Sequence, residues 1–216
     1  MGAVVRVKQD NPQKELVAKG IHVLLRKGCI VMPTDSVYGI GAALVPQNSG
    51  HTRIFEIKKR DRAQTLPLLL ADPQDIELFG LDIADWVYPV IKQFWPGALT
   101  VVVKAAPLVP KDYVAADGTI AVRVPASEFV RQLARGCGGA LAVTSANTHG
   151  APSPAAFDEL EGTVEEKADL VFDGGACPLG IASTIIDATG AQPRLLREGG
   201  VSFQAICEAA QARITP

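Results

Sequence analysis

Apolar residues recur along this chain with two spacings, and the two spacings predict its elements. Short apolar or β-branched runs bounded by Gly, Pro or polar residues predict strands over residues 4–8, 29–32, 66–71, 99–104, 120–124, 140–144, 170–172, 183–187 and 194–197. Apolar residues three and four apart predict helices between Pro12 and Gly28, from Pro73 onward, and over residues 52–59, 84–94, 126–135, 155–167 and 203–212. The alternation indicates an α/β fold, and neighbouring strands near the end without helices between them indicate a mixed sheet.

Length and composition narrow the class of protein. The 216 residues show no repeat, low-complexity segment or linker, so we expect a single domain over residues 1–216 with a large core. The content of 48% hydrophobic and 20% charged residues is typical of a compact soluble protein. No apolar run reaches the roughly 18–20 residues that span a bilayer, and residues 1–10 lack the apolar core of a signal peptide. We therefore expect a cytoplasmic protein with no membrane contact.

Metal and disulfide chemistry is weakly supported. The four cysteines are far apart and form no CxxC motif, and the three histidines share no metal-ligand spacing. We expect the cysteines to be small buried hydrophobes in a reducing compartment, and we expect no metal held by protein ligands alone. The net charge of −2 argues against a strongly basic nucleic-acid binder but allows a local basic patch.

Four segments share one design, in which an apolar strand ends in polar residues bounded by glycine or proline. They cover residues 33–41, 123–125, 144–154 and 197–200. The carboxyl ends of strands in an α/β sheet converge on one crevice, where ligands usually bind. The first of these segments lacks GxGxxG and GxxxxGK[ST], so it is either an ordinary turn or a ligand loop of another kind.

Two pairs of polar residues are candidates for binding an anion. Lys58 and Arg60 would diverge on a helix but share a face in an extended stretch, where they would suit a polyphosphate. The alternative is a solvated helix end, where cations favour the negative end of the dipole. Ser145 and Asn147 lie on one side of an extended loop, and an ordinary Asn/Ser turn is the alternative. Ser145 has no Gly-x-Ser-x-Gly elbow, so hydrolase chemistry is weakly supported.

Taken together, seven runs resemble the YrdC family of L-threonylcarbamoyladenylate synthases. They are MPTDSVYGIGA (32–42), IFEIKKRD (54–61), FWPGALTVVVKA (94–105), TIAVRVPAS (119–127), VTSANTHGAPSP (143–154), DGGACPLGIASTIID (173–187) and RLLREGG (194–200). They occur in the family's order and cover almost the whole chain, so the combination is specific although each run alone is not.

The resemblance implies a fold and a reaction. The fold is a twisted mixed β-sheet flanked by helices, with a large concave cavity. The enzyme would be a nucleotidyltransferase that condenses L-threonine, bicarbonate and ATP into threonylcarbamoyl-AMP and pyrophosphate for N6-threonylcarbamoyladenosine in tRNA. Mg²⁺ would arrive with the ATP phosphates, and downstream threonylcarbamoyl-transfer proteins would take the product onward.

The resemblance also implies residue roles. Lys58 and Arg60 would be the catalytic cations. The residues that would bind ATP are Lys58, Arg60, Thr119, Ser145, Asn147 and Arg197. The residues that would hold threonine are Thr34, Tyr38, Arg123 and Ser183, with Arg123 as a bidentate partner of the carboxylate. No protein nucleophile or general base stands out, so catalysis would depend on positioning and charge stabilisation.

The chain departs from the family pattern just after Arg60. The run Asp61-Arg62-Ala63-Gln64-Thr65 replaces the family's usual proline, and the alignment can slide by two residues, so Arg62 could share the role of Arg60. Two other functions stay open. A carbamoyl adenylate domain of hydrogenase maturation would need zinc-finger and acylphosphatase-like segments that we do not find. The second is a non-catalytic RNA-binding module or paralogue, which the DNPQ start (10–13) resembles and the acidic balance disfavours.

Overall fold

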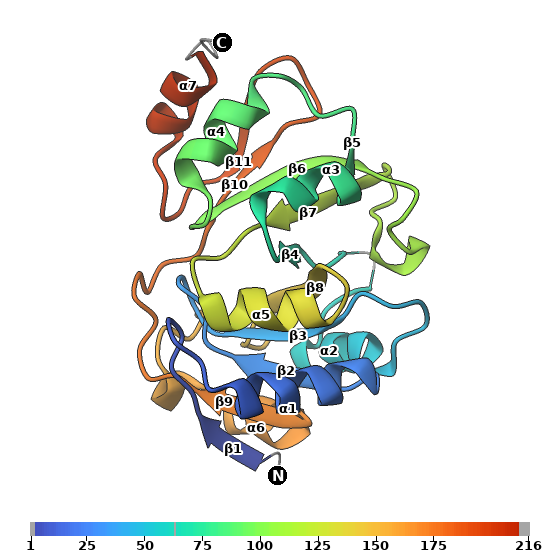
Figure 1. The fold of residues 1–216 in the computed structure, drawn as a ribbon, viewed down its shortest axis with the longest axis vertical. Coiled ribbons are helices and arrows are strands. Elements are labelled where there is room, and N and C mark those ends of the chain that lie inside the picture. The colour runs from blue at the N-terminus through green and yellow to red at the C-terminus, as the bar shows by residue number, and fades with distance from the viewer. Residues whose placement is uncertain (1–2, 63, 212–216) are drawn as a thin grey trace.

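A single mixed sheet organises the molecule (Figure 1). The computed structural model describes residues 3–62 and 64–211. The sheet has eleven strands in the order β1-β9-β2-β3-β8-β4-β7-β6-β10-β11, with β5 paired to β6. The strands are β1 (Ala3–Arg6), β2 (Cys29–Met32), β3 (Gly39–Ala43), β4 (Leu68–Leu70), β5 (Gly80–Leu81), β6 (Leu99–Ala105), β7 (Thr119–Arg123), β8 (Ala140–Ser145), β9 (Leu170–Asp173), β10 (Thr184–Asp187) and β11 (Arg194–Arg197).

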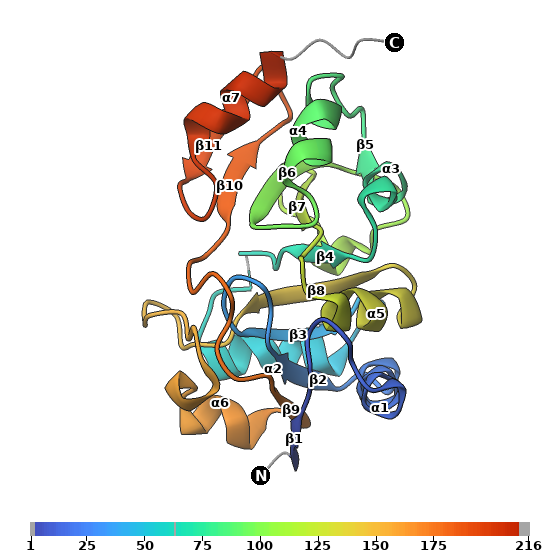
Figure 2. The ribbon, with the colours of Figure 1, turned by 60° about the vertical axis from the view of Figure 1, so that its left-hand side comes forward.

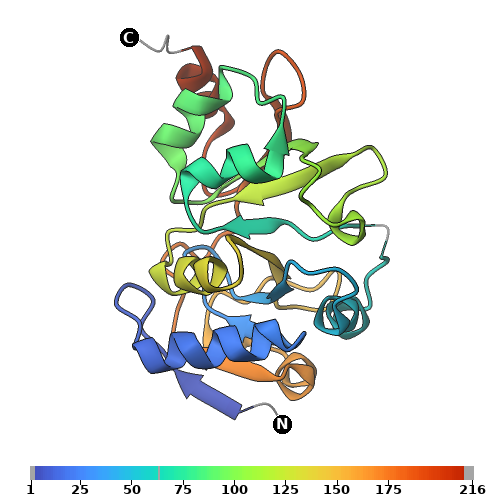
Figure 3. The ribbon, with the colours of Figure 1, turned by 45° about the vertical axis from the view of Figure 1, so that its right-hand side comes forward.

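The helices pack along this sheet in groups. They are α1 (Lys14–Leu25), α2 (Ser49–Lys58), α3 (Ile76–Phe79), α4 (Val87–Phe94), α5 (Glu128–Gly136), α6 (Gly162–Lys167) and α7 (Phe203–Gln211). Helix α1 packs on α5, α2 on α6, and α4 on α7 (Figure 3). None of the helices within the described residues is long and apolar enough to cross a membrane.

Both strand directions occur, which confirms the predicted mixed α/β sheet. Strands β1, β2 and β9 pair in parallel, as do β4 with β7 and β6 with β10, whereas β3 runs antiparallel to β2 and β8. After β9 the chain leaves one half of the sheet and enters the other at β10 (Figure 2). The segment between them, residues 174–183, therefore links the two halves.

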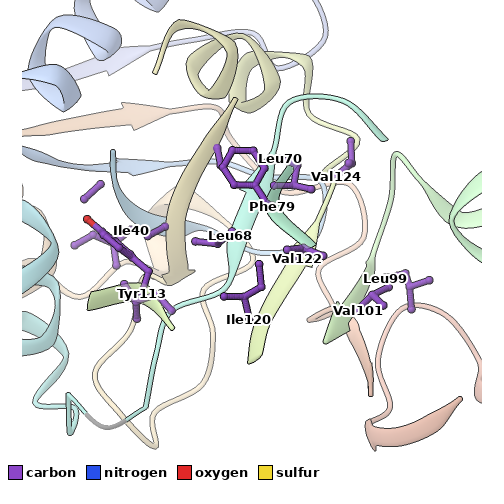
Figure 4. Close-up of a cluster of buried hydrophobic side chains, with 14 of the residues drawn as sticks. Ile40, Leu68, Leu70, Phe79, Leu99, Val101, Tyr113, Ile120, Val122 and Val124 are labelled. Atoms are coloured by element: carbon purple, nitrogen blue, oxygen red, sulfur yellow. The ribbon is translucent and has the colours of Figure 1, made fainter. Parts of the chain in front are cut away.

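Side-chain alternation along the strands builds a core on each face of the sheet. In β2, Cys29 and Val31 join one apolar cluster, whereas Ile30 and Met32 join the other. This division follows from the pleat, which points successive side chains to opposite faces. Figure 4 shows part of the first cluster, including Leu68 and Val122 from neighbouring strands. Cys29, Cys137 and Cys177 are buried as expected, and Cys207 is half-buried.

The structure corrects three of the predicted elements. Residues 39–41, predicted as part of a ligand loop, belong to the central strand β3, because antiparallel pairing on both sides satisfies their backbone. The helix predicted over 155–167 is only a 3₁₀ turn (Phe157–Glu159) followed by the short α6. The helix predicted after Asp72-Pro73 is likewise a 3₁₀ turn followed by the four-residue α3. Residue 212, at the end of the last predicted helix, lies outside the described residues.

Candidate active site

A cavity of about 320 Å³ lies over the middle of the sheet. All four segments predicted to converge contribute to its wall, so this prediction is confirmed. The lining residues from these segments are Thr34, Ser36, Val37, Tyr38, Gly39, Arg123, Thr144, Ser145, Ser153 and Arg197. Arg60, Thr65, Thr100 and Ser183 complete most of the polar wall. Side chains from both halves of the sheet therefore face one space.

Three arginines make this cavity strongly cationic. Arg60 donates to Thr144 Oγ1 (3.3 Å) and to Thr65 O (3.2 Å), and its buried Nε has no hydrogen-bond partner among the described residues. Arg197 donates to the carbonyl oxygen of Ser183 through Nη2 (2.7 Å) and Nε (3.2 Å). Neither guanidinium forms an ion pair with a carboxylate in the described part of the chain. Burial lowers the pKa of both groups, which is the electrostatic cost that an anionic ligand would relieve.

The third arginine, Arg123, already has a carboxylate partner. Its Nη2 donates to Asp35 Oδ1 (2.6 Å), its Nη1 to Ser36 Oγ (2.7 Å) and its Nε to Gly97 O (2.8 Å). Burial lowers the pKa of Arg123, and Asp35 opposes that shift. A guanidinium has five N–H donors, so two remain for a ligand after these three bonds. Arg123 therefore holds the turn at 34–36 and keeps two N–H donors for a ligand.

Lys58 lies beneath the cavity rather than in its wall. It is the last residue of α2, and its buried Nζ donates to Ser145 O (2.5 Å) and Asn147 O (2.6 Å). Burial, with a smaller effect of Arg60, lowers the pKa of Lys58 to about 8. Lys59 adopts a left-handed conformation (φ 50°), so the chain turns between the two cations and only Arg60 faces the cavity. Lys58 and Arg60 thus converge on the same loop from different directions.

The loop after β8 carries the predicted Ser145 and Asn147. Ser145 lines the cavity, whereas the buried Asn147 does not. Asn147 Nδ2 donates to Thr148 O (2.9 Å) and Ala151 O (2.7 Å), which folds the loop back on itself. The two residues are neighbours in space, as the spacing suggested, but their side chains face different surroundings.

Thr34 and Tyr38 shape the end of the cavity formed by the turn between β2 and β3. Thr34 Oγ1 donates to Val37 O (2.7 Å) and accepts from the backbone N–H groups of Ser36 and Val37, so this hydroxyl closes the turn. Tyr38 is fully buried, and its hydroxyl donates to Gly175 O (2.8 Å) and accepts from Gly174 N (3.0 Å). Burial raises the pKa of Tyr38. Both side chains fix the wall rather than offering free donors.

Ser183 faces the cavity from the start of β10. Its Oγ lies 2.8 Å from Thr100 Oγ1, and its carbonyl oxygen accepts from Arg197. The 174–183 segment thereby holds Arg197 against the wall.

Besides Lys58 and Asn147, two further predicted ATP-binding residues lie outside the cavity lining. Thr119 starts β7, and its Oγ1 donates to Asp117 (2.7 Å). Arg62 is exposed, pairs with Glu56 (3.6 Å) and borders a separate depression beside α2. Of the two candidate arginines, Arg60 is therefore the one that faces the cavity.

Several polar residues at the cavity were not predicted individually, although Thr144 and Asp35 lie within two of the predicted segments. Thr65, Thr100 and Thr144 all line it, and Asp35 lies behind Arg123, with one buried carboxylate oxygen that has no partner in the described part of the chain. Asp35 could have been found from the sequence, because a carboxylate directly after an apolar strand needs a partner when it is buried. Thr100 and Thr144 carried no such signal, because threonine is common in strands.

Comparisons with known proteins place this chain in a family. The Sua5/YciO/YrdC family model, described as "Telomere recombination", matches residues 22–199. The chain is 35% identical over 183 residues to a threonylcarbamoyl-AMP synthase of Pyrococcus abyssi, covering 84% of this chain and 54% of that protein. It is 36% identical over 179 residues to a putative threonylcarbamoyl-AMP synthase of Mycobacterium tuberculosis strain H37Rv, covering 83% and 82%.

Solved structures agree with these matches. The structure of P. abyssi Sua5 complexed with L-threonine has a TM-score of 0.87 and 30% identity, covering 96% of this chain and 60% of that one. Escherichia coli YciO has a TM-score of 0.84 and 26% identity, covering 94% and 98%. The chain thus spans little more than half of the P. abyssi protein. By sequence and by structure, it belongs to the Sua5/YciO/YrdC family.

Proposed function

We propose that this protein is a threonylcarbamoyl-AMP synthase, a nucleotidyltransferase that acts as a single unit over residues 1–216. The observation that carries the proposal is a pair of cations, the half-buried Arg60 and the exposed Arg197, which face one cavity without a carboxylate partner in residues 3–62 and 64–211. A polyphosphate would supply the missing negative charge, and planar guanidinium groups suit its oxygens. The names of the relatives support ATP and L-threonine as substrates.

The two substrates would occupy different ends of the cavity. The phosphates of ATP would lie between Arg60, Arg197 and the Ser145 loop, with Lys58 holding that loop from below. Threonine would lie toward the turn at 34–38 and Ser183, with its carboxylate on the two free donors of Arg123. Thr34 and Tyr38 would set the shape of that end. We propose no direct ATP contact for Thr119 or Arg62 in this arrangement.

The reaction needs two bond-forming steps. The threonine amine and bicarbonate would first give a carbamate and water. A carbamate oxygen would then attack the α-phosphorus of ATP, and the bond to the β-phosphate oxygen would break to release pyrophosphate. The arginines would stabilise the charge that develops on the departing pyrophosphate. The residues that line the cavity would position the carbamate.

Mg²⁺ would be bound mainly by the ATP phosphates. Within the described residues, no group of three or more His, Cys, Asp and Glu side chains could hold a metal ion, and Asp35 is engaged by Arg123. Such a site fits an ion that keeps its waters and phosphate ligands. When bound, Mg²⁺ would neutralise part of the phosphate charge. The product would pass to threonylcarbamoyl-transfer proteins that modify tRNA in the cytoplasm.

One assay tests the proposal. The protein is incubated with ATP, Mg²⁺ and bicarbonate, with and without L-threonine, and pyrophosphate and the adenylate are followed. We expect threonine-dependent release of pyrophosphate together with threonylcarbamoyl-AMP. Threonine-independent release, or none, would contradict the synthase. Tight RNA binding with a steep salt dependence and no adenylate would support the RNA-binding alternative instead.

A further inference from the structure

Glu161 lies outside the cavity lining, yet both of its carboxylate oxygens engage the loop that carries Ser145 and Asn147. Glu161 immediately precedes α6. Its Oε1 accepts from the backbone N–H of Thr148 (2.7 Å), and its Oε2 accepts from Thr148 Oγ1. These two bonds lower the pKa of Glu161, so the side chain is a carboxylate at neutral pH. A charge-assisted pair of this kind is a strong local restraint.

The same loop is also held by the end of α2. Lys58 Nζ donates to the carbonyl oxygens of Ser145 and Asn147, and Lys58 O accepts from His149 N (2.8 Å). Helices α2 and α6 also contact each other directly. Residues 145–149 therefore lie between a lysine on one helix and a glutamate at the start of another.

Glu161 also affects the charge of Lys58. Burial and the neighbouring Arg60 lower the pKa of Lys58, and Glu161 raises it. Arg60 belongs to the segment after α2, Glu161 precedes α6, and the exposed His149 is the titratable side chain on the loop itself. Lys59 also acts on Glu161 and favours its charged form. Glu161 is thus the acidic group that supports the ammonium form of Lys58.

We propose that Glu161 is a positioning residue of the anion site. Through Thr148 it holds the Ser145–Asn147 loop against Lys58, and its negative charge keeps Lys58 protonated beneath the cavity. The kinetic part of this proposal rests on the proposed synthase function, whereas the effect on anion affinity does not.

Three variants separate the hydrogen bonds between Glu161 and Thr148, which we call the clamp, from the negative charge of Glu161. Glu161→Gln keeps the shape but removes the charge, Thr148→Val removes only the hydroxyl, and Glu166→Gln makes the same charge change at an exposed position of α6. We expect Glu161→Gln to raise the KM for ATP about tenfold and to move the alkaline fall in kcat/KM to lower pH. Thr148→Val should raise the KM about threefold without moving the pH profile. Glu166→Gln should match the wild type. The pH profiles are repeated in a His149→Gln background, which removes the titratable side chain on the loop itself.

Calorimetric titration with inorganic pyrophosphate at pH 7.5 and pH 9 gives a readout that needs no turnover. We expect weaker binding by Glu161→Gln at both pH values, with the larger deficit at pH 9. If no threonine-dependent turnover exists, the proposed function fails and this titration still decides the role of Glu161. Equal pyrophosphate affinity for Glu161→Gln and Glu166→Gln would overturn the proposal. So would a pH profile that Thr148→Val shifts as far as Glu161→Gln does. Thermal melts check that each variant is folded. If Glu161→Gln is unfolded, Thr148→Val still tests the clamp.

Discussion

Arg123 Nη2 and Asp35 Oδ1 lie 2.6 Å apart, with each side chain only 7% exposed. This ion pair joins β7 to the turn after β2 behind the cavity. Removing one partner leaves an unpaired buried charge, so we expect Asp35→Ala to lower the free energy of unfolding by about 3 kcal/mol. Urea denaturation measures this change. Lys104→Ala, which breaks the exposed pair with Asp82, should cost less than about 1 kcal/mol. Equal effects would show that burial does not matter here.

Arg60 and Arg62 form a natural test of the proposed phosphate site. Arg60 faces the cavity, whereas Arg62 is exposed and pairs with Glu56. We expect Arg60→Ala to reduce kcat/KM for ATP by about 10²-fold or more, because a charge aimed at the departing pyrophosphate is lost. Arg62→Ala should stay within about threefold of the wild type. Pyrophosphate release measures both, and a near-wild-type Arg60→Ala would remove Arg60 from the proposed mechanism.

Thr34 should affect threonine more than ATP. Its hydroxyl closes the turn at 34–37, so Thr34→Val removes the bonds that shape this end of the cavity. We expect the KM for threonine to rise at least about tenfold and the KM for ATP to change little. Thr34→Ser keeps the hydroxyl and serves as the control. An equal rise in both KM values would place Thr34 outside the threonine end.

His51 predicts a pH dependence of stability. The buried imidazole lies between Phe55 and Tyr113, its Nε2 has no partner in the described chain, and burial lowers its pKa. Below the unfolded value of about 6.5, the unfolded chain binds a proton that the folded protein resists. The free energy of unfolding should therefore fall as the pH drops from about 7 to 5. Urea titrations should show a smaller fall for His51→Gln, and the exposed His22→Gln should behave like the wild type.

Gly50 lets α2 approach the end of α1 closely. A Cβ at this position would lie 2.5 Å from the backbone carbon and oxygen of Gly28, which cannot move aside easily. We expect Gly50→Ala to destabilise the protein by about 1–3 kcal/mol. A Cβ on Gly162 in α6 would meet no described atom within 4 Å, so Gly162→Ala should instead stabilise the protein by about 0.5 kcal/mol. Thermal denaturation compares the two, and a neutral Gly50→Ala would show that the helix can shift.

Much of the architecture could be predicted because apolar periodicity is a local property. The run at 29–32 and the β-branched run at 99–104 are strands as expected, and together with their neighbours they form a mixed sheet. Strand β3 was missed because Gly39 and Gly41 have low strand propensity. Its place is decided by close packing, since a Cβ on Gly41 would lie 2.7 Å from Met32 Cε and from Val143 Cγ2.

The sequence by itself determined most of the strands and helices and the polar segments at the strand ends. Its combination of motifs also indicated the family. Only the tertiary structure decided which side chains face the cavity. Lys58 and Arg60 are separated by one residue, but Lys58 turns toward carbonyl oxygens 87 and 89 residues further along the chain, while Arg60 reaches the cavity wall. The direction of a long charged side chain depends on acceptors from distant loops, and those acceptors are brought together only when the sheet is complete.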